Sequence, residues 1–370
     1  MRKLLLIALM CSPIFLLAQT PRMVLIEEAT QASCPPCAGL NPQVQALVNA
    51  NSDNTIFLGY QVWWPGYDPM FLDNPDEVVD RVTYYGVTAA PTLIYQGTPS
   101  AQTVSQSLID QQTATDSEFA ITLEAEVRNG VLQVSGNVEA TMAASGDFKL
   151  RIALSEDLIT IQDAPGGTNG ETEYHHVFKK FIGGSAGYDL DDTWAVGDTY
   201  EINGSLALGD VNIYHYDGLE VIAWIQNDAD QYVHQAAKTT EISITSDYAN
   251  NGITLAASNL PVTVCGGMQV IEPVFKLQNG GGENLTSATI TYSVNGGDAQ
   301  TYNWTGDIAP PAAEEIALPA IAFDAVSGEV STLTIMVSEP NGMTDEDTSN
   351  DATNATIDPA PNTMGTATLT

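Results

Sequence analysis

Two cysteines with two residues between them, Cys34 and Cys37, separate a continuous apolar run from a segment of helical periodicity. The run at 23–29, MVLIEEA, has the character of a buried strand, and residues 35–52 repeat apolar side chains along one helical face. Pro42 falls inside this segment, where a proline kinks or restarts a helix. The pattern predicts a strand that leads directly into a Cys-x-x-Cys pair at the start of a helix.

Strand and helix patterns continue to alternate through the next sixty or so residues. Apolar runs at 55–64 and 90–97 predict further strands, and the segments 74–86 and 100–113 predict helices. A β-α-β opening of this kind predicts an α/β sheet domain over 19–113.

From residue 114 the chain changes to short alternating strands separated by Asn-Gly and Ser-Gly turns, without a convincing helix. This texture predicts one β-sandwich over 114–246 and a second over 247–358, both immunoglobulin-like, with 359–370 as a linker or truncated end. The expected fold class is multidomain: an α/β domain followed by two all-β sandwiches.

The beginning of the chain predicts export. Cations and then a short apolar stretch fill residues 1–18 and end at the small residue Ala18, as in a cleaved signal peptide. The alternative is a lipoprotein anchored at Cys11, although Met10 is larger than the residue that lipoprotein processing prefers before the cysteine. No later stretch approaches the length of a membrane span, so we expect no transmembrane span in the mature chain.

The charge balance restricts the partners. Asp and Glu number 46 against 11 Lys and Arg, so no basic patch can neutralise phosphates, and nucleic acid is not expected as a partner. The acidic blocks predict a solvated surface, with calcium binding as the alternative in an exported protein.

The cysteine pair predicts thiol–disulfide chemistry. Cys34 at a helix N-terminus would have its thiolate favoured by unpaired N–H groups and the helix dipole, which makes it the nucleophile. Cys37, one turn later, would resolve the mixed disulfide. Pro35 and Pro36 suit the first helical turn and stiffen the ring that a disulfide closes.

Three further residues are placed where such chemistry needs them. Pro91 opens the strand predicted at 90–97, where a cis proline can lie beside the cysteine pair, and Ala90 could offer its backbone to an extended peptide. Glu28, six residues before Cys34, could have a raised pKa and take the proton of Cys37. Glu27 is expected on the opposite face of the strand.

The aromatic residues Trp63 and Trp64 lie in a long connection together with Tyr67 and Phe71. They predict either an apolar groove for substrate peptide or a satellite core that lets the connection fold. The remaining cysteine, Cys265, follows a predicted strand and is expected to be a buried thiol, with an intermolecular bridge as the alternative.

Metal binding is the weaker interpretation of these features. Zinc would need two more ligands beside Cys34 and Cys37, and the chain has no second Cys-x-x-Cys. His175 and His176 are neighbours on a predicted strand and would point to opposite faces. We therefore expect no metal and no cofactor.

A strand leading to Cys-x-x-Cys at a helix start, followed by a strand, a helix and the "APT" strand, resembles the thioredoxin superfamily over about residues 22–113. The resemblance implies a nucleophile at Cys34, a resolving cysteine at Cys37, a cis peptide at Ala90–Pro91 and a buried acid at Glu28. Ser33 stands where the family usually has tryptophan, and the stretch YQVWWPGYDPMFLDNPDEV is longer than in a minimal member.

The whole chain is similar to the Omp twenty-eight type of outer-membrane or secreted proteins of Bacteroidetes. The signal, "VLIEEATQASCPPC", "YHHVFKKFIGG" and "IEPVFKLQNGGGENLTSATITYSVNGG" carry this resemblance. It implies an outer-membrane, periplasmic or secreted location in a Gram-negative bacterium and a multidomain architecture. The resemblance supports location and architecture more than an activity, because the biochemical role of that family is poorly defined.

These observations lead to two hypotheses. The first is an exported thiol–disulfide oxidoreductase-like protein that acts on protein or peptide thiols and disulfides. The second is a non-enzymatic cell-surface or secreted binding protein with cell-envelope partners, in which the thioredoxin-like part is an inert scaffold. The sequence leaves open whether the cysteine pair turns over.

Overall fold

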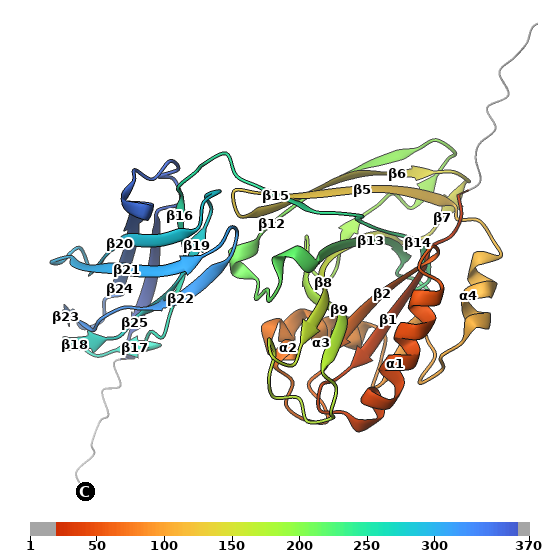
Figure 1. The fold of residues 1–370 in the computed structure, drawn as a ribbon, viewed down its shortest axis with the longest axis horizontal. Coiled ribbons are helices and arrows are strands. Elements are labelled where there is room, and N and C mark those ends of the chain that lie inside the picture. Colours follow the sequence, from red (N-terminus) through yellow and green to blue (C-terminus); the bar gives the residue numbers. More distant parts are fainter. Residues whose placement is uncertain (1–19, 362–370) are drawn as a thin grey trace, which may run out of the picture.

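The computed structural model describes residues 20–361, so the predicted signal peptide and Cys11 lie outside the described residues. The protein is mostly β, with several sheets and four α-helices in the described part. Figure 1 shows a larger part that contains the helices and a smaller all-β part that follows it along the chain. None of the described helices is long and apolar enough to cross a membrane.

The larger part begins with the predicted strands and helices in the predicted order, with one further short helix and one further short strand among them. These elements are β1 (Val24–Thr30), α1 (Pro35–Ala50), β2 (Thr55–Gln61), α2 (Pro69–Asp73), α3 (Pro75–Tyr84), β3 (Thr92–Tyr95), β4 (Thr98–Pro99) and α4 (Gln106–Thr113). Helix α1 begins directly after Cys34 and continues through Pro42.

The rest of the larger part is made of strands and two short 3-10 turns. The strands are β5 (Phe119–Arg128), β6 (Val131–Ala140), β7 (Ala144–Ser145), β8 (Phe148–Thr160), β9 (Glu173–Phe181), β10 (Tyr188–Asp189), β11 (Thr193–Trp194), β12 (Thr199–Ala207), β13 (Leu219–Asn227), β14 (Val233–Lys238) and β15 (Ser243–Thr245). The 3-10 turns are η1 (Leu208–Asp210) and η2 (Tyr216–Gly218).

One long sheet joins the two halves of the larger part, in the order β14-β13-β8-β9-β2-β1-β3-β4. The junction is the parallel pairing of β2 with β9, in register at Gly59 and Val177. The sheet therefore contains strands from both sides of residue 113. The α/β domain expected over 19–113 and the β-sandwich expected over 114–246 thus share a sheet. The domain ranges themselves stay predictions.

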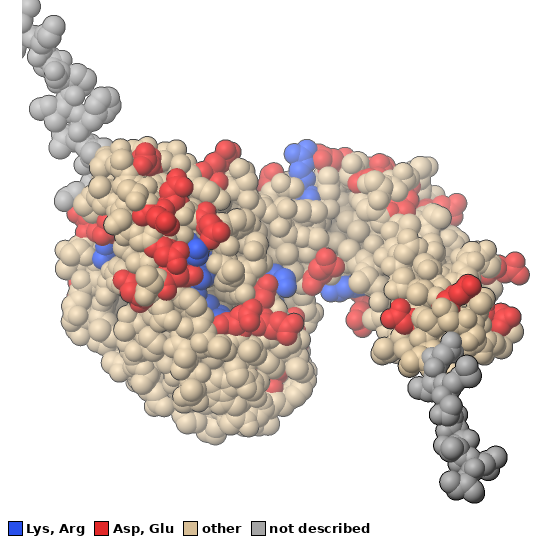
Figure 2. Space-filling view, turned by 180° about the vertical axis from the view of Figure 1, so that it is seen from behind, with Lys and Arg blue, Asp and Glu red and all other residues tan. Residues whose placement is uncertain are grey.

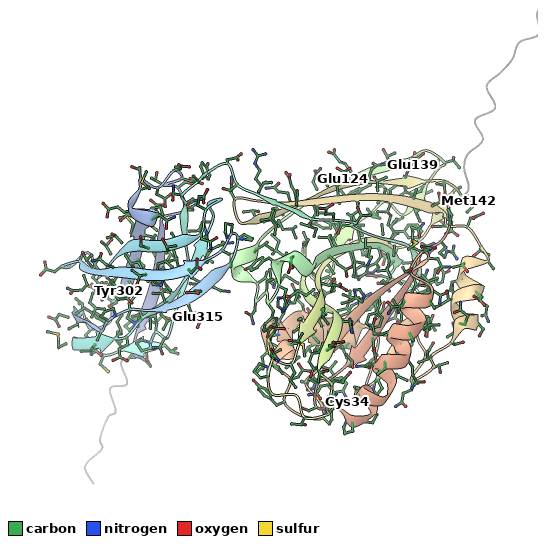
Figure 3. The ribbon with its side chains drawn as sticks, viewed as in Figure 1. Cys34, Glu124, Glu139, Met142, Tyr302 and Glu315 are labelled. Carbon is green, nitrogen blue, oxygen red and sulfur yellow. A yellow bond between two sulfur atoms is a disulfide. The ribbon has the colours of Figure 1, made fainter. Side chains whose placement is uncertain are left out.

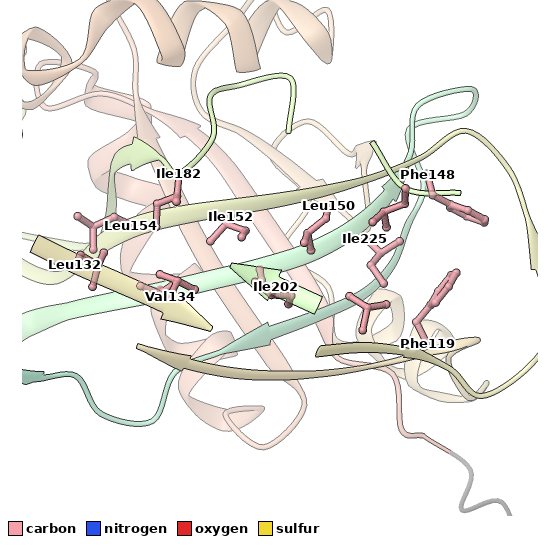
Figure 4. Packing of buried hydrophobic residues seen from close by; sticks show 14 of the residues in the cluster. Phe119, Leu132, Val134, Phe148, Leu150, Ile152, Leu154, Ile182, Ile202 and Ile225 are labelled. Carbon is pink, nitrogen blue, oxygen red and sulfur yellow. The ribbon is translucent and has the colours of Figure 1, made fainter. Parts of the chain in front are cut away.

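Different layers cover the two ends of this sheet. Around β1, β2 and β3, helices α1 and α4 pack on one face and α3 packs on the other. At the other end, a second sheet of order β12-β6-β5-β15 packs on β8 and β13. Figure 4 shows this core, where Phe119, Leu132 and Val134 of the second sheet face Phe148, Leu150, Ile152 and Ile225.

Strand β13 shows why its sequence is apolar throughout. Val221, Ala223 and Ile225 point into the core between the two sheets. The alternate residues Ile222 and Trp224 point to the opposite face, into the core under α3. Because both faces of the strand are buried, the sequence lacks the polar alternation of a half-exposed strand.

The smaller part encloses one hydrophobic core between two main sheets, of order β16-β19-β22 and β17-β25-β24-β20-β21. Its strands are β16 (Gly252–Ser258), β17 (Thr263–Val264), β18 (Gly267–Ile271), β19 (Val274–Asn279), β20 (Leu285–Val294), β21 (Gln300–Ile308), β22 (Ala313–Ala317), β23 (Ile321–Ala325), β24 (Ser331–Ser338) and β25 (Ala352–Pro359), with the 3-10 turn η3 (Pro340–Gly342). The thioredoxin-like and immunoglobulin-like assignments stay predictions.

Cys265 corrects one expectation. It is exposed and forms no disulfide within residues 20–361, so the predicted buried thiol is wrong. The preceding strand β17 is only two residues long, and its Val264 points into the core. The next residue therefore lies outside the core, since side chains alternate along an extended chain.

Candidate functional site

Cys34 and Cys37 form a disulfide at the start of α1. Cys34 is the N-cap residue of the helix, and its Sγ accepts a hydrogen bond from the backbone N–H of Cys37 at 3.2 Å. Both side chains are sheltered, with exposed fractions of 1% for Cys34 and 0% for Cys37. The pair therefore lies at the positive end of the helix dipole, and both side chains are buried just beneath the protein surface.

The turn before β3 lies against the disulfide. The Ala90–Pro91 peptide bond is cis, and Cys34 Sγ lies 3.6 Å from the carbonyl oxygen of Ala90. Strand β3 begins one residue later than Pro91 and pairs antiparallel with β1. The tertiary structure thus brings Ala90 and Pro91 to the cysteine pair.

Glu28 lies on the strand that leads to the pair and on the face of the sheet that α1 covers. It is 1% exposed, and its Oε1 has no hydrogen-bond partner among the described residues. Burial, and then the nearby Glu171 carboxylate, raise the pKa of Glu28 to about 8. Near neutral pH this carboxyl group can both hold and release a proton.

Glu27 points to the opposite face of β1, as its position in the strand predicts. It forms a buried bidentate ion pair with Arg81 of α3. The hydrogen bonds of this carboxylate within the described residues go to Arg81, Tyr60 and Tyr85, and not to the disulfide.

The two tryptophans have different surroundings. Trp64 packs against the buried cluster under α3, with its ring 4.1 Å from that of Trp63. Trp63 is 43% exposed, and Tyr67 of the same connection is exposed as well. The connection therefore contains both a buried anchor and an exposed aromatic surface, and a substrate contact by Trp63 or Trp64 stays a prediction.

A loop from the second half of the larger part lies on the cysteine turn. This loop, residues 161–172 between β8 and β9, is called the β8–β9 loop below. The Asn169 backbone N–H donates to the carbonyl of Ala32 at 3.2 Å, and its side-chain Nδ2 donates to the carbonyl of Cys34 at 3.3 Å. The Thr168 N–H donates to Ser33 Oγ at 3.2 Å. Sequence reasoning missed this loop, because its Gly-rich sequence indicates a turn and nothing about its distant contact.

Asp68 is a second residue that the sequence did not single out. Its Oδ2 accepts the N–H of Ala32 at 2.7 Å, and its Oδ1 accepts the first N–H groups of α2 from Met70 and Phe71. Burial raises the pKa of Asp68 to about 6, although these backbone donors oppose the rise. The helix-start pattern Asp-Pro was the available signal for its role as a cap.

Gly167 sets how closely the β8–β9 loop approaches the turn, which gives a testable expectation. A Cβ at Gly167 would lie 2.6 Å from the carbonyl oxygen of Ala32 and 2.9 Å from its Cβ. We expect Gly167→Ala to lower the free energy of unfolding by about 1–3 kcal/mol through overpacking. Urea titration followed by tryptophan fluorescence measures this.

Gly39→Ala is the matched control. Gly39 lies within α1, and a Cβ there would meet nothing within 4 Å. The same substitution should therefore stabilise the protein by roughly 0.5–1 kcal/mol. Equal stability of the Gly167 variant and the wild type would contradict the close packing of the loop on the turn.

One group of side chains within residues 20–361 has the spacing of a metal site. Asp157, His176 and Glu220 place their ligand atoms within 4.8 Å of one another. His176 Nδ1 lies 2.7 Å from Glu220, whose other oxygen accepts a hydrogen bond from Lys238 at 2.6 Å. Because an ammonium group already compensates the carboxylate, the contacts account for the cluster without an ion. The absence of a metal or cofactor stays a prediction.

The comparisons with known proteins find likeness in structure. No protein-family model matches the chain, and no curated protein matches it in sequence. The structure is similar to that of HBP35 of Porphyromonas gingivalis, with a TM-score of 0.52 and 10% identity over 92% of this chain and 99% of that chain. A domain of the outer membrane lipoprotein Omp28 from the same organism matches 35% of this chain and 92% of its own length, with a TM-score of 0.25 and 12% identity. At these identities, the similarity to HBP35 shows that the two chains share a fold along nearly their whole lengths.

Proposed function

We propose that this chain is an exported thiol–disulfide oxidoreductase whose thioredoxin-like part uses Cys34 as nucleophile and Cys37 as resolving cysteine. The observation that carries the proposal is the position of the disulfide, at the N-terminus of α1 and 3.6 Å from the Ala90 carbonyl. An extended substrate peptide that pairs with this backbone would bring its sulfur to Cys34.

The proposed reaction starts from the dithiol. The Cys34 thiolate attacks a substrate disulfide, which forms a mixed disulfide and releases one substrate sulfur as a thiolate. Cys37 then transfers its proton to Glu28 and attacks the sulfur of Cys34, which releases the second substrate sulfur as a thiolate; both thiolates take protons from solvent. Two electrons pass from the protein to the substrate, and a dithiol partner protein must return them.

The surface around the site suits a protein substrate. Figure 3 places Cys34 at the lower end of the larger part, and Figure 2 shows that this end carries few charged side chains on the face it displays. Trp63, Tyr67 and Leu72 are exposed apolar residues of the connection beside the cysteine turn. Such a surface favours contact with apolar segments of a protein or peptide.

The predicted signal peptide supports a location in the cell envelope or outside the cell, where disulfides persist. The β-rich parts, which we propose to be immunoglobulin-like, would act as spacers or recognition modules. The strongly acidic composition is consistent with this, because a net charge of -35 limits nonspecific adhesion to anionic surfaces.

The burial of both sulfur atoms favours a second candidate function. A disulfide that substrates cannot reach would only staple the turn, and the protein would then be a cell-envelope binding protein on an inert scaffold. Accessibility of the pair to thiols in solution distinguishes the two functions.

Insulin reduction with dithiothreitol tests the proposal. We expect turnover by the wild type and complete loss in Cys34→Ser, because the nucleophilic sulfur is removed. Cys265→Ser is the control, because Cys265 is exposed and unpaired and should leave the rate unchanged. Failure of the wild type to turn over, together with a disulfide that resists mild reductant, would exclude the oxidoreductase.

A further inference from the structure

A small chamber lies beside Glu28, between β1, β2, α1 and the start of β9. Its volume is about 20 Å³, and its walls include Glu28, Asn41, Gln45 and Glu171. Glu28 Oε1 is buried without a hydrogen-bond partner in the described part of the chain. A chamber of this size with polar walls can hold one water molecule, which would complete the hydrogen bonding of the carboxyl group.

The chamber is adjacent to a groove of about 420 Å³ between α1 and the β8–β9 loop. Five residues line both spaces, namely Asn41, Gln45, Glu171, Glu173 and His175. The groove is lined further by exposed residues such as Pro42 and Gly170, so it opens to the surface. Water can therefore approach Glu28 along this side of α1.

Glu171 is held at the junction of the chamber and the groove. Asn41 of α1 donates a hydrogen bond to its Oε1 at 2.7 Å, and Asn169 of the β8–β9 loop donates to its Oε2 at 2.5 Å. Burial raises the pKa of Glu171 despite these two donors. The side chain is thus fixed in orientation and half-buried, and no cationic group of the described residues pairs with it.

The ionisable groups around Glu28 come from three directions. Glu171, Glu173, Tyr174 and His175 lie around the chamber, from the β8–β9 loop and β9. Tyr95 approaches from β3, and its pKa is raised by burial and by Glu28. Burial and then the neighbouring His176 lower the pKa of His175, against the carboxylates of Glu173 and Asp157. A proton leaving Glu28 therefore meets carboxylates and water on the groove side.

We propose that Glu171 is the outer carboxylate of a proton path that joins Glu28 to solvent through the chamber and the groove. This role rests on the proposed function, in which Glu28 receives the proton of Cys37. The proton then passes to Glu171 through the chamber water and from Glu171 to water in the groove. This regenerates the carboxylate form of Glu28, the minor form at neutral pH, for the next proton of Cys37. Glu171 makes no contact with the substrate sulfur atoms and acts through Glu28.

Hydrogen–deuterium exchange of the Glu28 carboxyl group tests the path without any turnover. The disulfide form is mixed into deuterium oxide at pH 6, and the infrared C=O stretch of the protonated carboxyl is followed; Glu28→Gln identifies the band. We expect Glu171→Gln to slow the exchange by about 10²-fold, since positioned proton-transfer groups contribute on this order. Glu171→Asp, which keeps an ionisable carboxyl group, should recover part of the rate.

Glu173→Gln is the matched control, because Glu173 lines the same spaces but is exposed and makes no hydrogen bond to Asn41 or Asn169. In this variant the Glu28 carboxyl group should exchange its proton for deuterium at the wild-type rate. An unchanged rate in Glu171→Gln would overturn the path, even if the titration midpoint of Glu28 fell because a neighbouring charge was removed. Since the measurement needs only the folded disulfide form, an absence of insulin reduction would count against the proposed function and leave this result standing.

Discussion

Arg81→Met is expected to lower the free energy of unfolding by about 3–5 kcal/mol, because it leaves a buried carboxylate without its partner. The guanidinium of Arg81 contacts both oxygens of Glu27, at 2.8 and 2.9 Å, and the side chains are only 2% and 0% exposed. It also donates to Tyr85 and to Gln226, and its Cζ lies 5.1 Å from the Trp224 ring.

The position of this pair explains the size of the effect. Glu27 is on β1 and Arg81 on α3, whereas Gln226 is on β13 in the other half of the long sheet. The substitution therefore removes, besides the ion pair, the Arg81–Gln226 hydrogen bond that connects the two halves of the larger part. Denaturant titration followed by tryptophan fluorescence measures the change.

Arg128→Met is the control for this expectation. Arg128 and Asp247 also form a bidentate ion pair, but their side chains are 51% and 45% exposed. Water and salt screen such a pair, so its loss should leave the unfolding curve nearly unchanged. If the Arg81 and Arg128 variants lost similar stability, burial would not be the cause. In the double variant Glu27→Gln with Arg81→Met, part of the loss should be recovered, because no unpaired charge remains.

Glu28→Gln is expected to remove a large pH dependence of stability. The pKa of Glu28 rises from 4.5 to about 8 because burial disfavours the carboxylate. Below about pH 4.5 both the folded and the unfolded chain carry the proton. Between pH 4.5 and 8 the unfolded chain releases it and the folded chain keeps it, so stability falls as the pH rises.

The size of this loss follows from the two pKa values. A change from 4.5 to about 8 corresponds to on the order of 5 kcal/mol between pH 4.5 and pH 9. The difference in unfolding free energy between the wild type and Glu28→Gln should change by this amount and stay constant above the pKa of about 8. Urea titrations of the disulfide form across this pH range measure the difference.

Glu124→Gln provides the comparison for Glu28→Gln. Glu124 is an exposed carboxylate on the outer surface of β5, at the upper edge of the molecule in Figure 3. In Glu124→Gln, the free energy of unfolding should depend on pH in the same way as in the wild type. Parallel profiles for the wild type and Glu28→Gln would mean that Glu28 is hydrated and ionises normally.

Much of the fold around the cysteine pair could be predicted from local sequence. Buried strands were expected at 23–29 and 55–64 and appear as β1 and β2, and the expected helix at 35–52 appears as α1. The helix expected at 100–113 is shorter, because α4 begins only after Ser105. Periodicity and turn residues act between neighbours in the chain, so these elements can be recognised without knowledge of their partners.

The surroundings of the site could not be predicted in the same way. Asn169 contacts Cys34 across 135 positions, and Arg81 contacts Gln226 across 145. The strings around Asn169 and Glu171 indicate only a turn. The contacts of these residues with the site depend on the pairing of β9 with β2, because this pairing brings the β8–β9 loop to the cysteine turn.

The sequence by itself determined the cysteine pair at a helix start, Glu28 on the strand before it, the alternation of strand and helix in the first part, and the all-β character of the rest. Only the tertiary structure decided that one sheet continues across residue 113 and that Glu171 lies beside Glu28. The physical reason is that strand pairing is made of backbone hydrogen bonds, which any sequence can form, so the choice of partner depends on how distant faces pack together.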